Sequence, residues 1–301
     1  TGSAVANNES WNGSSWTEIA DLNTARNSLG TSGTQTSALA YGGDTPPNVA
    51  NTESWDGSSW TEVNDLATAR SGAPGSGANN TSALVTSGAP IPSTGTEEWA
   101  FSGIPPTAPA AGYSDAIVGQ MYYNSTSGQF KAIKNGGAPL GSWASGGALN
   151  TARNQIGNAG SGVTNALGFG GNLPGGEQKL TESYNGTSWT EVADLNVVRR
   201  LIDGIGATNT AALAVGGYGG PPGYQDLVEQ WDGSSWTEIA ETNSVHGTGG
   251  SAGTTTSGLV FGGVPSVTPS ALTESWNGSS WTEVGDLNDA RIHLGSCGTS
   301  N

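Results

Sequence analysis

The chain has 301 residues, of which 49 are Gly, 14 are Pro and 11 are Trp, and it carries 9 basic against 25 acidic side chains, a net charge of −16. This acidic excess repels phosphate backbones and anionic lipid, so we expect no nucleic-acid partner and no membrane insertion, and the single Cys excludes an intrachain disulfide. High Gly and Pro content is typical of disordered chains, but the Trp content indicates a packed core, because each buried Trp removes roughly 150–250 Å² from water.

A repeat rich in Trp recurs along the chain. Complete copies occupy residues 9–26, 53–70, 182–199, 229–246 and 274–291, and a sixth copy is split between Glu97 with Trp99 and residues 143–153. Equivalent Trp residues follow one another at 44 to 47 residues, measured across the split. A period of about 40–50 residues predicts one propeller blade per repeat, so we expect residues 1–301 to form a single domain.

Four strands are predicted in each repeat, and we name them a to d from the axis outwards. A Gly-rich stretch such as 27–33 is strand a, and the alternation of Leu39 and Tyr41 with small residues before a Gly pair is strand b. Strand c ends at an aromatic residue such as Trp11, and an Asn-Gly or Asp-Gly turn leads to strand d, which begins at the second Trp.

The Gly pair after an apolar strand, the aromatic residue before Asp/Asn-Gly and the Trp that follows resemble the kelch repeat. This resemblance implies an all-β propeller of four-stranded blades. The pattern is incomplete at residues 86–88, which lack the Gly pair, and at His246, which replaces the repeat Arg. We expect six blades, with the ring closed by strand pairing of the two termini: residues 2–6 as strand b and 291–295 as strand a. Five blades is the alternative if the termini do not pair.

The repeated charges point to a structural role. We expect each repeat Arg to bond a carboxylate or carbonyl between blades, rather than to form a functional ring, and the repeated carboxylates such as Glu18 to lie on a solvated outer face. His246, His293 and Cys297 fall on predicted inner strands at the closure, where a metal is conceivable, but a confident site needs three or four ligands at matched spacing. We therefore expect no catalytic residues, no metal and no cofactor.

The loops between strands b and c differ most among the copies, and they share one face with the d–a loops. Divergent loops on a rigid scaffold are a usual place for recognition, and Pro lowers the ordering cost of binding. We expect this face to bind a ligand or partner, the alternative being loops under little constraint. The candidate contacts are Tyr41, Lys179, Tyr218 and Tyr224.

One c–d loop carries an insertion, residues 104–142. Within it, apolar residues alternate on both sides of a Ser-Thr-Ser-Gly turn, which predicts a β-hairpin. Such a hairpin is marginally stable alone, so we expect it to pack on the propeller or on a neighbouring subunit. We also expect a homo-oligomer within an assembly, formed through this insertion because its Lys residues locally offset the acidic field. The candidate assembly contacts are Met121, Tyr122, Tyr123, Phe130, Lys131 and Lys134.

The segment Y-Y-N-S-T-S-G-Q-F-K at 122–131 resembles a motif of virion structural proteins in tailed bacteriophages, and W-A-S-G-G-A-L-N-T-A-R at 143–153 resembles repeats of marine phage tail fibres. The resemblance implies a non-enzymatic virion surface protein that contacts other virion proteins and a host receptor or glycan. The alternatives are a secreted cellular lectin or adhesin and, less favoured, a sugar-processing propeller enzyme. Because the chain begins at Thr1 without a signal-like segment, we expect a processed protein or part of a longer polypeptide.

Overall fold

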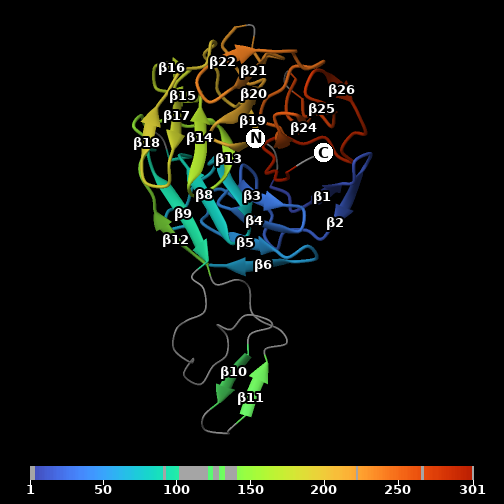
Figure 1. Cartoon of the computed structure of the whole chain (residues 1–301). Coiled ribbons are helices and arrows are strands. Elements are labelled where there is room, and N and C mark those ends of the chain that lie inside the picture. Colours follow the sequence, from blue (N-terminus) through green and yellow to red (C-terminus); the bar gives the residue numbers. More distant parts are fainter. Residues whose placement is uncertain are drawn as a thin grey trace.

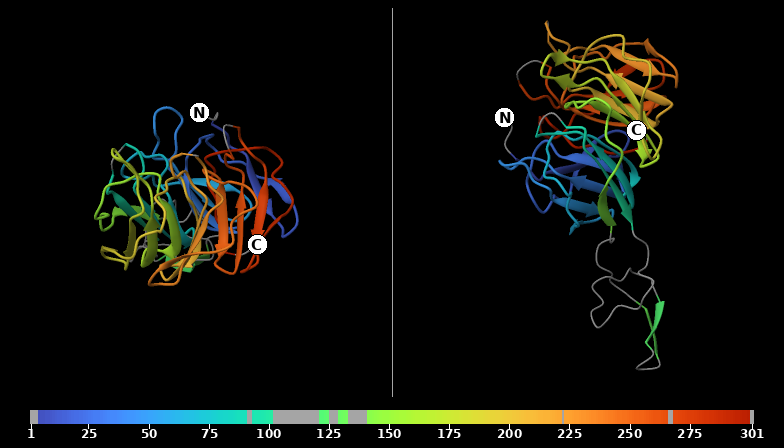
Figure 2. Two further views of the ribbon diagram at one scale, coloured as in Figure 1. Left: turned by 90° about the horizontal axis from the view of Figure 1, so that it is seen from above. Right: turned by 90° about the vertical axis from the view of Figure 1, so that its left-hand side faces the viewer.

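The computed structural model of the chain describes residues 4–90, 93–101, 121–124, 129–132, 141–221, 223–265 and 268–299. Every regular element within these ranges is a β-strand. Figure 1 shows the strands gathered into blades around a common axis, and Figure 2 shows the same blades from two further sides. The described part of the chain is therefore an all-β propeller, as the repeat predicts.

Five four-stranded antiparallel sheets form the blades. The first blade contains β3 (Gly30–Thr34), β4 (Ser37–Tyr41), β5 (Thr52–Trp55) and β6 (Trp60–Val63). The second contains β7 (Gly75–Asn79), β8 (Ser82–Thr86), β9 (Thr96–Phe101) and β12 (Gly141–Ser145). The third contains β13 (Gly157–Gly162), β14 (Asn165–Phe169), β17 (Thr181–Tyr184) and β18 (Trp189–Glu191). The fourth contains β19 (Asp203–Thr208), β20 (Ala211–Val215), β21 (Val228–Trp231) and β22 (Trp236–Glu238). The fifth contains β23 (Gly250–Thr254), β24 (Ser257–Phe261), β25 (Thr273–Trp276) and β26 (Trp281–Glu283).

The Gly-rich strand a is innermost in each blade, as predicted. β3 lies against β7, β7 against β13, β13 against β19, and β19 against β23. Small residues permit this approach, because a larger side chain near the axis would meet the neighbouring blade. At Gly204, for example, a Cβ atom would lie 2.1 Å from the carbonyl oxygen of Asn158. The Gly content that suggested disorder is thus used to pack inner strands around the axis.

The hairpins between strands c and d follow the prediction, and their Asn or Asp has a further role. Trp11 pairs with Trp16, so strand d begins at the second Trp, as predicted, and the loop contains four residues. Within it only Gly13 has a positive φ, of 96°. The Asn12 side chain instead accepts hydrogen bonds from the backbone N–H groups of Ser14 and Ser15, each at 2.9 Å. The conserved shape of these loops therefore comes from a side-chain cap as well as from Gly.

The core consists of clusters between blades rather than one central mass. Between consecutive blades, the large third residue of one strand b, in most blades together with a large fifth residue, packs on small residues at the second and fourth positions of the next strand b. Leu39 and Tyr41, for instance, pack against Ala83 and Val85. Equivalent clusters join the second blade to the third, the third to the fourth and the fourth to the fifth. Alternation of large and small residues along strand b thus fixes the stacking of the blades.

The expectation of six blades is wrong: the structure has five. The first repeat copy forms only a two-stranded sheet of β1 (Asn8–Trp11) and β2 (Trp16–Ile19), and residues 292–299 form no strand. Val5, in the segment expected to be strand b, instead accepts a hydrogen bond from the Arg26 N–H, as Val49 does from the Arg70 N–H. Because Val49 lies in the loop just before strand c, residues 4–7 correspond to that loop and not to a strand. Residues 1–3 lie outside the described residues.

Side-chain contacts and single backbone hydrogen bonds, not paired strands, bring the two ends of the described chain together. Arg291 forms an ion pair with Glu9 on β1 and donates to the Asn7 carbonyl at 3.0 Å. Ser296 then links the first and fifth blades, because its carbonyl accepts from the Thr31 hydroxyl at 2.7 Å and its hydroxyl donates to the Ser251 carbonyl at 2.8 Å. The C-terminal segment therefore lies between β3 and β23 without forming a strand.

The predicted hairpin in the insertion is confirmed. β10 (Met121–Asn124) pairs antiparallel with β11 (Gln129–Ala132), with Tyr123 opposite Phe130, and both strands lie between β9 and β12 in the sequence. Figure 1 shows the hairpin at its lower end. Residues 102–120, 125–128 and 133–140 of this region, including Lys134, lie outside the described residues. The b–c loop of the third blade adds a short pair that was not predicted, β15 (Asn172–Leu173) with β16 (Gly176–Glu177).

Candidate functional site

The divergent b–c loops lie on the same face as the d–a loops, as expected, and we call this the loop face. Isolated backbone bridges join the two sets, one in each of four blades. They are Asn27 with Asp44, Ser71 with Ala89, Asn154 with Asn172, and Arg200 with Tyr218. Since each bridge holds a b–c loop against the preceding d–a loop, the loop face is a connected surface rather than a set of independent loops.

An inner rim of backbone hydrogen bonds supports the loop face. The residue that follows each bridge position has a left-handed backbone, with φ between 52° and 60°. Most of these residues donate an N–H to the carbonyl of their counterpart in the neighbouring repeat: Gly72 to Ser28, Ser28 to His293, His293 to Thr248, Thr248 to Leu201, and Leu201 to Gln155. Left-handed backbone is costly for residues other than Gly, so it indicates a rim that the surrounding fold holds in place.

Arg200, Tyr218 and Tyr224 form a tyrosine–arginine cluster on the loop face. The Arg200 guanidinium carbon lies 4.7 Å from the centre of the Tyr218 ring, and the Tyr218 and Tyr224 rings meet edge to face with centres 5.5 Å apart. The guanidinium also contacts Glu177 at 3.2 Å and donates to the Gln155 side chain at 2.8 Å. A cation over one aromatic face and a second ring at its edge make a compact polar and aromatic surface.

The backbone holds this cluster in place. The Tyr218 N–H donates to the Arg200 carbonyl at 2.7 Å, the reverse bond measures 3.0 Å, and a further bridge joins Tyr218 to Tyr224. The Arg200 side chain keeps 27% of its exposure, and both Tyr residues are half-buried. Burial raises the pKa of Tyr224, partly offset by the nearby Arg200 charge. The cluster is therefore ordered but still open to a partner.

The structure brings together two of the four predicted contact residues. Tyr218 and Tyr224 are in contact, and Lys179 is exposed on a b–c loop. The expectation for Tyr41 is wrong, since it is only 1% exposed and donates its hydroxyl to the Thr31 carbonyl at 3.1 Å inside the core. Sequence reasoning missed Arg200. Its signal was the doubled Arg at 199–200, because the second Arg stands where the other copies have Asn, Ser, Gly or Ile.

The repeat Arg residues are structural, as expected. Each one leaves a d–a loop and pairs with the Glu of the next strand c, and most of these side chains are buried. The pairs are Arg26 with Glu53 (3.2 Å), Arg70 with Glu97 (2.7 Å), Arg153 with Glu182 (2.9 Å), Arg199 with Glu229 (2.7 Å) and Arg291 with Glu9. Burial lowers the pKa of Arg26, Arg153, Arg199 and Arg291, and for the first three the paired Glu opposes this effect. The repeat carboxylate Glu18 and its counterparts Glu62, Glu191, Glu238 and Glu283 are exposed, as predicted.

His246 takes the place of a repeat Arg rather than facing the axis. Its Nε2 lies 3.2 Å from Glu274 Oε1, and both side chains are almost fully buried. Burial acts to raise the pKa of Glu274, but hydrogen bonds from His246 and Asn243 outweigh it and leave that pKa below its ordinary value. Nearby, burial raises the pKa of Asp203 to about 6, against opposing contributions from His246 and the Gly249 N–H.

The space along the axis is small. It measures about 80 Å³ and is bordered by backbone-rich stretches of the five strands a and by residues 296–298. Cys297 borders it, and burial raises the pKa of this thiol to about 12. Across the described ranges no three His, Cys, Asp or Glu side chains are grouped so that they could hold a metal ion.

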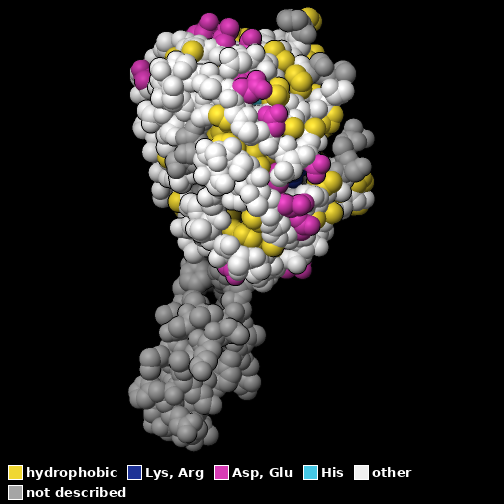
Figure 3. Space-filling model, turned by 90° about the vertical axis from the view of Figure 1, so that its right-hand side faces the viewer, with side chains coloured by type: hydrophobic (Ala, Val, Ile, Leu, Met, Phe, Trp, Pro, Cys, Tyr) yellow, Lys and Arg dark blue, Asp and Glu magenta, His cyan; other side chains and the backbone are white. Residues whose placement is uncertain are grey.

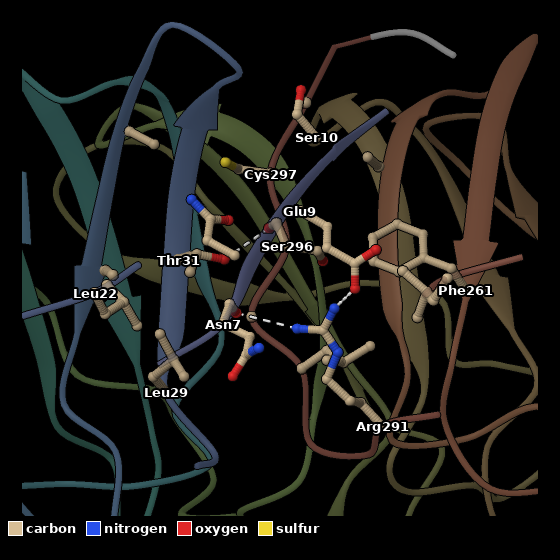
Figure 4. A pocket seen from close by; sticks show the side chains of 18 of the residues that line it. Asn7, Glu9, Ser10, Leu22, Leu29, Thr31, Phe261, Arg291, Ser296 and Cys297 are labelled. Carbon is tan, nitrogen blue, oxygen red and sulfur yellow. Dashed lines mark hydrogen bonds and ion pairs between the residues drawn. The ribbon is translucent and has the colours of Figure 1, made fainter. Parts of the chain in front are cut away.

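A larger cavity, of about 380 Å³, lies beside β1, and we call it the β1 cavity. Figure 4 shows its lining: Leu22, Leu29 and Thr31 on the side of the first blade, Phe261 on the side of the fifth, and Glu9 paired with Arg291 between them. Its volume falls in the range of about 300–1,000 Å³ that is usual for ligand sites. This cavity was not predicted, because the sequence pattern indicated a strand b at its position.

No protein-family model and no curated protein matches the chain.

Among the described residues there is no helix long and apolar enough to cross a membrane. Figure 3, which views the right-hand side of Figure 1, shows acidic side chains scattered among uncharged ones, with hydrophobic side chains in small groups. The candidate sites are thus the tyrosine–arginine cluster on the loop face and the β1 cavity.

Proposed function

We propose that this protein is a non-enzymatic structural module of a virion surface, on a tail fibre or capsid of a tailed bacteriophage, and that its loop face recognises a protein or glycan. Two resemblances support the assignment, the kelch-like style of the repeats and the phage-like segment at 122–131. The observation that carries the recognition role is the tyrosine–arginine cluster.

The cluster has the chemistry of a recognition site. Tyr and Arg dominate the residues that carry most binding energy at protein interfaces, because they combine a large contact area with directional donors. The backbone bridges of Arg200 with Tyr218 and of Tyr218 with Tyr224 fix both rings before a partner arrives, which lowers the entropic cost of binding. The flat rings suit a sugar face or a peptide plane, and the guanidinium supplies donors for hydroxyl or carbonyl oxygens.

The scaffold suits display. The inter-blade ion pairs and the repeated b-strand clusters join the blades into one scaffold, on which the b–c loops vary at the loop face and one c–d loop carries the insertion at residues 104–142. Loops on such a body can change without disturbing the core, because the contacts that hold the blades together come from other residues.

The test has two parts. Mass spectrometry of phage particles purified from a sample that contains this chain should find it with virion proteins. Binding to host cells and to a glycan array is then compared for the protein and its Tyr218→Ala/Tyr224→Ala variant, with Thr36→Ala on an a–b turn of the opposite face as control. We expect the double variant to lose at least about 30-fold in affinity while the control binds normally.

Two outcomes would contradict the proposal. Unchanged binding by a folded Tyr218→Ala/Tyr224→Ala variant would remove the cluster from recognition. Glycan binding by a chain that is never found with particles would favour the secreted lectin or adhesin instead.

A further inference from the structure

Strand β1 has one edge that no strand covers among the described residues. It pairs with β2 alone, whereas strand c of every blade pairs with strand b on one edge and strand d on the other. The difference appears in burial: all four residues of β5 are buried, while Asn8, Glu9 and Ser10 of β1 are half-buried. An uncovered strand edge presents backbone N–H and C=O groups that can pair with another strand.

The β1 cavity lies at this edge, in the position that strand b has in the blades. β1 borders it on the outer side and residues 292–298 border it on the inner side. The inner segment stands where a strand a would be, because Ser296 bonds to Thr31 on β3 and to Ser251 on β23. Strand b is the element between strands a and c in all five blades, so the cavity lies in the place of one strand.

The wall on the first blade matches a surface that elsewhere receives strand b. Between the first two blades, Leu39 and Tyr41 pack on Ala73, Ala83, Val85 and Trp99. The equivalent residues on the cavity wall, at the same positions in the preceding copy, are Leu29, Ala38, Ala40 and Trp55. This wall therefore accepts large side chains at the third and fifth positions of an extended strand.

The wall on the fifth blade sets the other two positions. Leu259 and Phe261 cluster with Trp11 of β1, and Phe261 also packs on Trp16 of β2 with ring centres 4.6 Å apart. In the blades, equivalent large residues meet the second and fourth residues of the next strand b, which are Ala, Val or Gly. An occupant must therefore be small at these positions. Since Glu9 and Arg291 neutralise each other at the cavity, it must also be uncharged there.

We propose that the β1 cavity binds an extended, uncharged segment of a partner polypeptide that adds to β1 as an antiparallel strand. The segment has five residues, small at the second and fourth, Leu at the third and aromatic or aliphatic at the fifth. A second copy of this chain is not the chosen occupant, because the described segments of this pattern, β4, β8, β14, β20 and β24, are already buried in their own blades. Strand addition of this kind gains affinity from main-chain hydrogen bonds and specificity from alternate side chains. The inference does not depend on the proposed function.

The first test uses the whole protein and a synthetic peptide with the sequence of residues 37–44, which contains β4. Fluorescence anisotropy of the labelled peptide should show saturable binding, and hydrogen exchange at the amides of β1 should slow. A control peptide with Leu39→Asp should bind at least about tenfold more weakly, which corresponds to about 1.4 kcal/mol, because its carboxylate would be buried against the wall of the first blade.

A second variant fills the cavity from within the chain. In this variant a copy of residues 37–44 is placed directly before Thr1. The copied Tyr then precedes Val5 by eight residues, as Tyr41 precedes Val49 in the first blade. We expect this extended chain to unfold at a higher temperature and to bind no peptide. A matched extension carrying the Leu39→Asp change should have neither effect.

Three results would overturn the proposal. They are no binding of the 37–44 peptide at millimolar concentration, equal binding of the Leu39→Asp peptide, and undiminished binding by the extended chain. Sedimentation of the protein alone gives a fourth: a dimer that the peptide dissociates would assign the β1 cavity to a second copy instead of a partner. None of these measurements involves the loop face, so they leave the test of the proposed function independent.

Discussion

The Arg199→Met substitution tests whether the repeat Arg residues clamp the blades together. Arg199 contacts Glu229 at 2.7 Å and donates to the carbonyls of Gly216 at 2.6 Å and Leu227 at 3.0 Å, and both charged side chains are 0% exposed. Met has a similar length but no donor. Its substitution would leave a buried carboxylate with only the two bonds from Asn196, at 2.7 and 2.8 Å, and two carbonyls without this donor.

The expected loss is about 3–5 kcal/mol in the free energy of unfolding, as for other buried ion pairs that lose one partner. This is a large share of the roughly 5–15 kcal/mol that stabilises most domains, so it should be plain in urea unfolding followed by Trp fluorescence. Arg291→Met is the matched control. Its side chain is 13% exposed, so water can replace part of the lost contact and the loss should be smaller.

A double variant distinguishes the cost of an unpaired Glu229 charge from the loss of the contacts that Arg199 makes. Arg199→Met with Glu229→Gln removes the isolated carboxylate and should recover part of the loss, while the Gln oxygen can still accept from Asn196. A loss below about 1 kcal/mol for Arg199→Met alone, no more than one ordinary hydrogen bond, would refute the clamp.

Two further predictions concern single positions. Burial raises the pKa of Asp203 from 3.8 to about 6, so ionisation of this group lowers the stability of the protein as the pH rises through that interval. Asp203→Asn should therefore stabilise the protein by up to about 3 kcal/mol at pH 7 and have no such effect below pH 4. Urea unfolding at both pH values measures this difference. Gly253→Ala should lower the thermal unfolding midpoint more than Gly176→Ala. Both residues have positive φ, +113° and +118°, but only at Gly253 would the new Cβ meet backbone, 2.2 Å from the Ser257 carbonyl oxygen. Equal midpoints for the two Gly variants would mean that backbone conformation alone governs both sites.

The propeller was predictable from sequence because several independent signals recur at the same spacing. The alternation of Leu39 and Tyr41 identifies strand b, and the Trp pair with its turn identifies strands c and d. The Arg at the end of five of the six copies could be assigned to the blade interface, because a charge that repeats with the fold is placed by the fold. Patterns of this kind report local geometry, and a propeller is largely built from local contacts between neighbouring repeats.

The tyrosine–arginine cluster was only half predictable. Tyr218 and Tyr224 stand in a divergent loop, where sequence comparison between copies finds them, but their partner Arg200 lies on a d–a loop and meets them through a backbone bridge. Tyr41 was misassigned for a related reason. It is the last residue of β4, and whether such a residue faces the surface or the next blade depends on packing against Trp143, which is distant in sequence.

The number of blades was overestimated because the repeat marks only part of a blade. A copy such as 9–26 contains strands c and d and the Arg that follows them, whereas strands a and b come from the residues before it. The first copy accordingly forms β1, β2 and the Arg26 clamp, and its Glu9 pairs with Arg291 as in the complete blades. Since the Arg291–Glu9 ion pair forms without a strand b, the ion pair between repeats does not require that strand. The number of repeat copies therefore predicts the number of Arg–Glu ion pairs rather than the number of blades. Among the described residues, the β1 cavity lies where such an ion pair forms without a strand b.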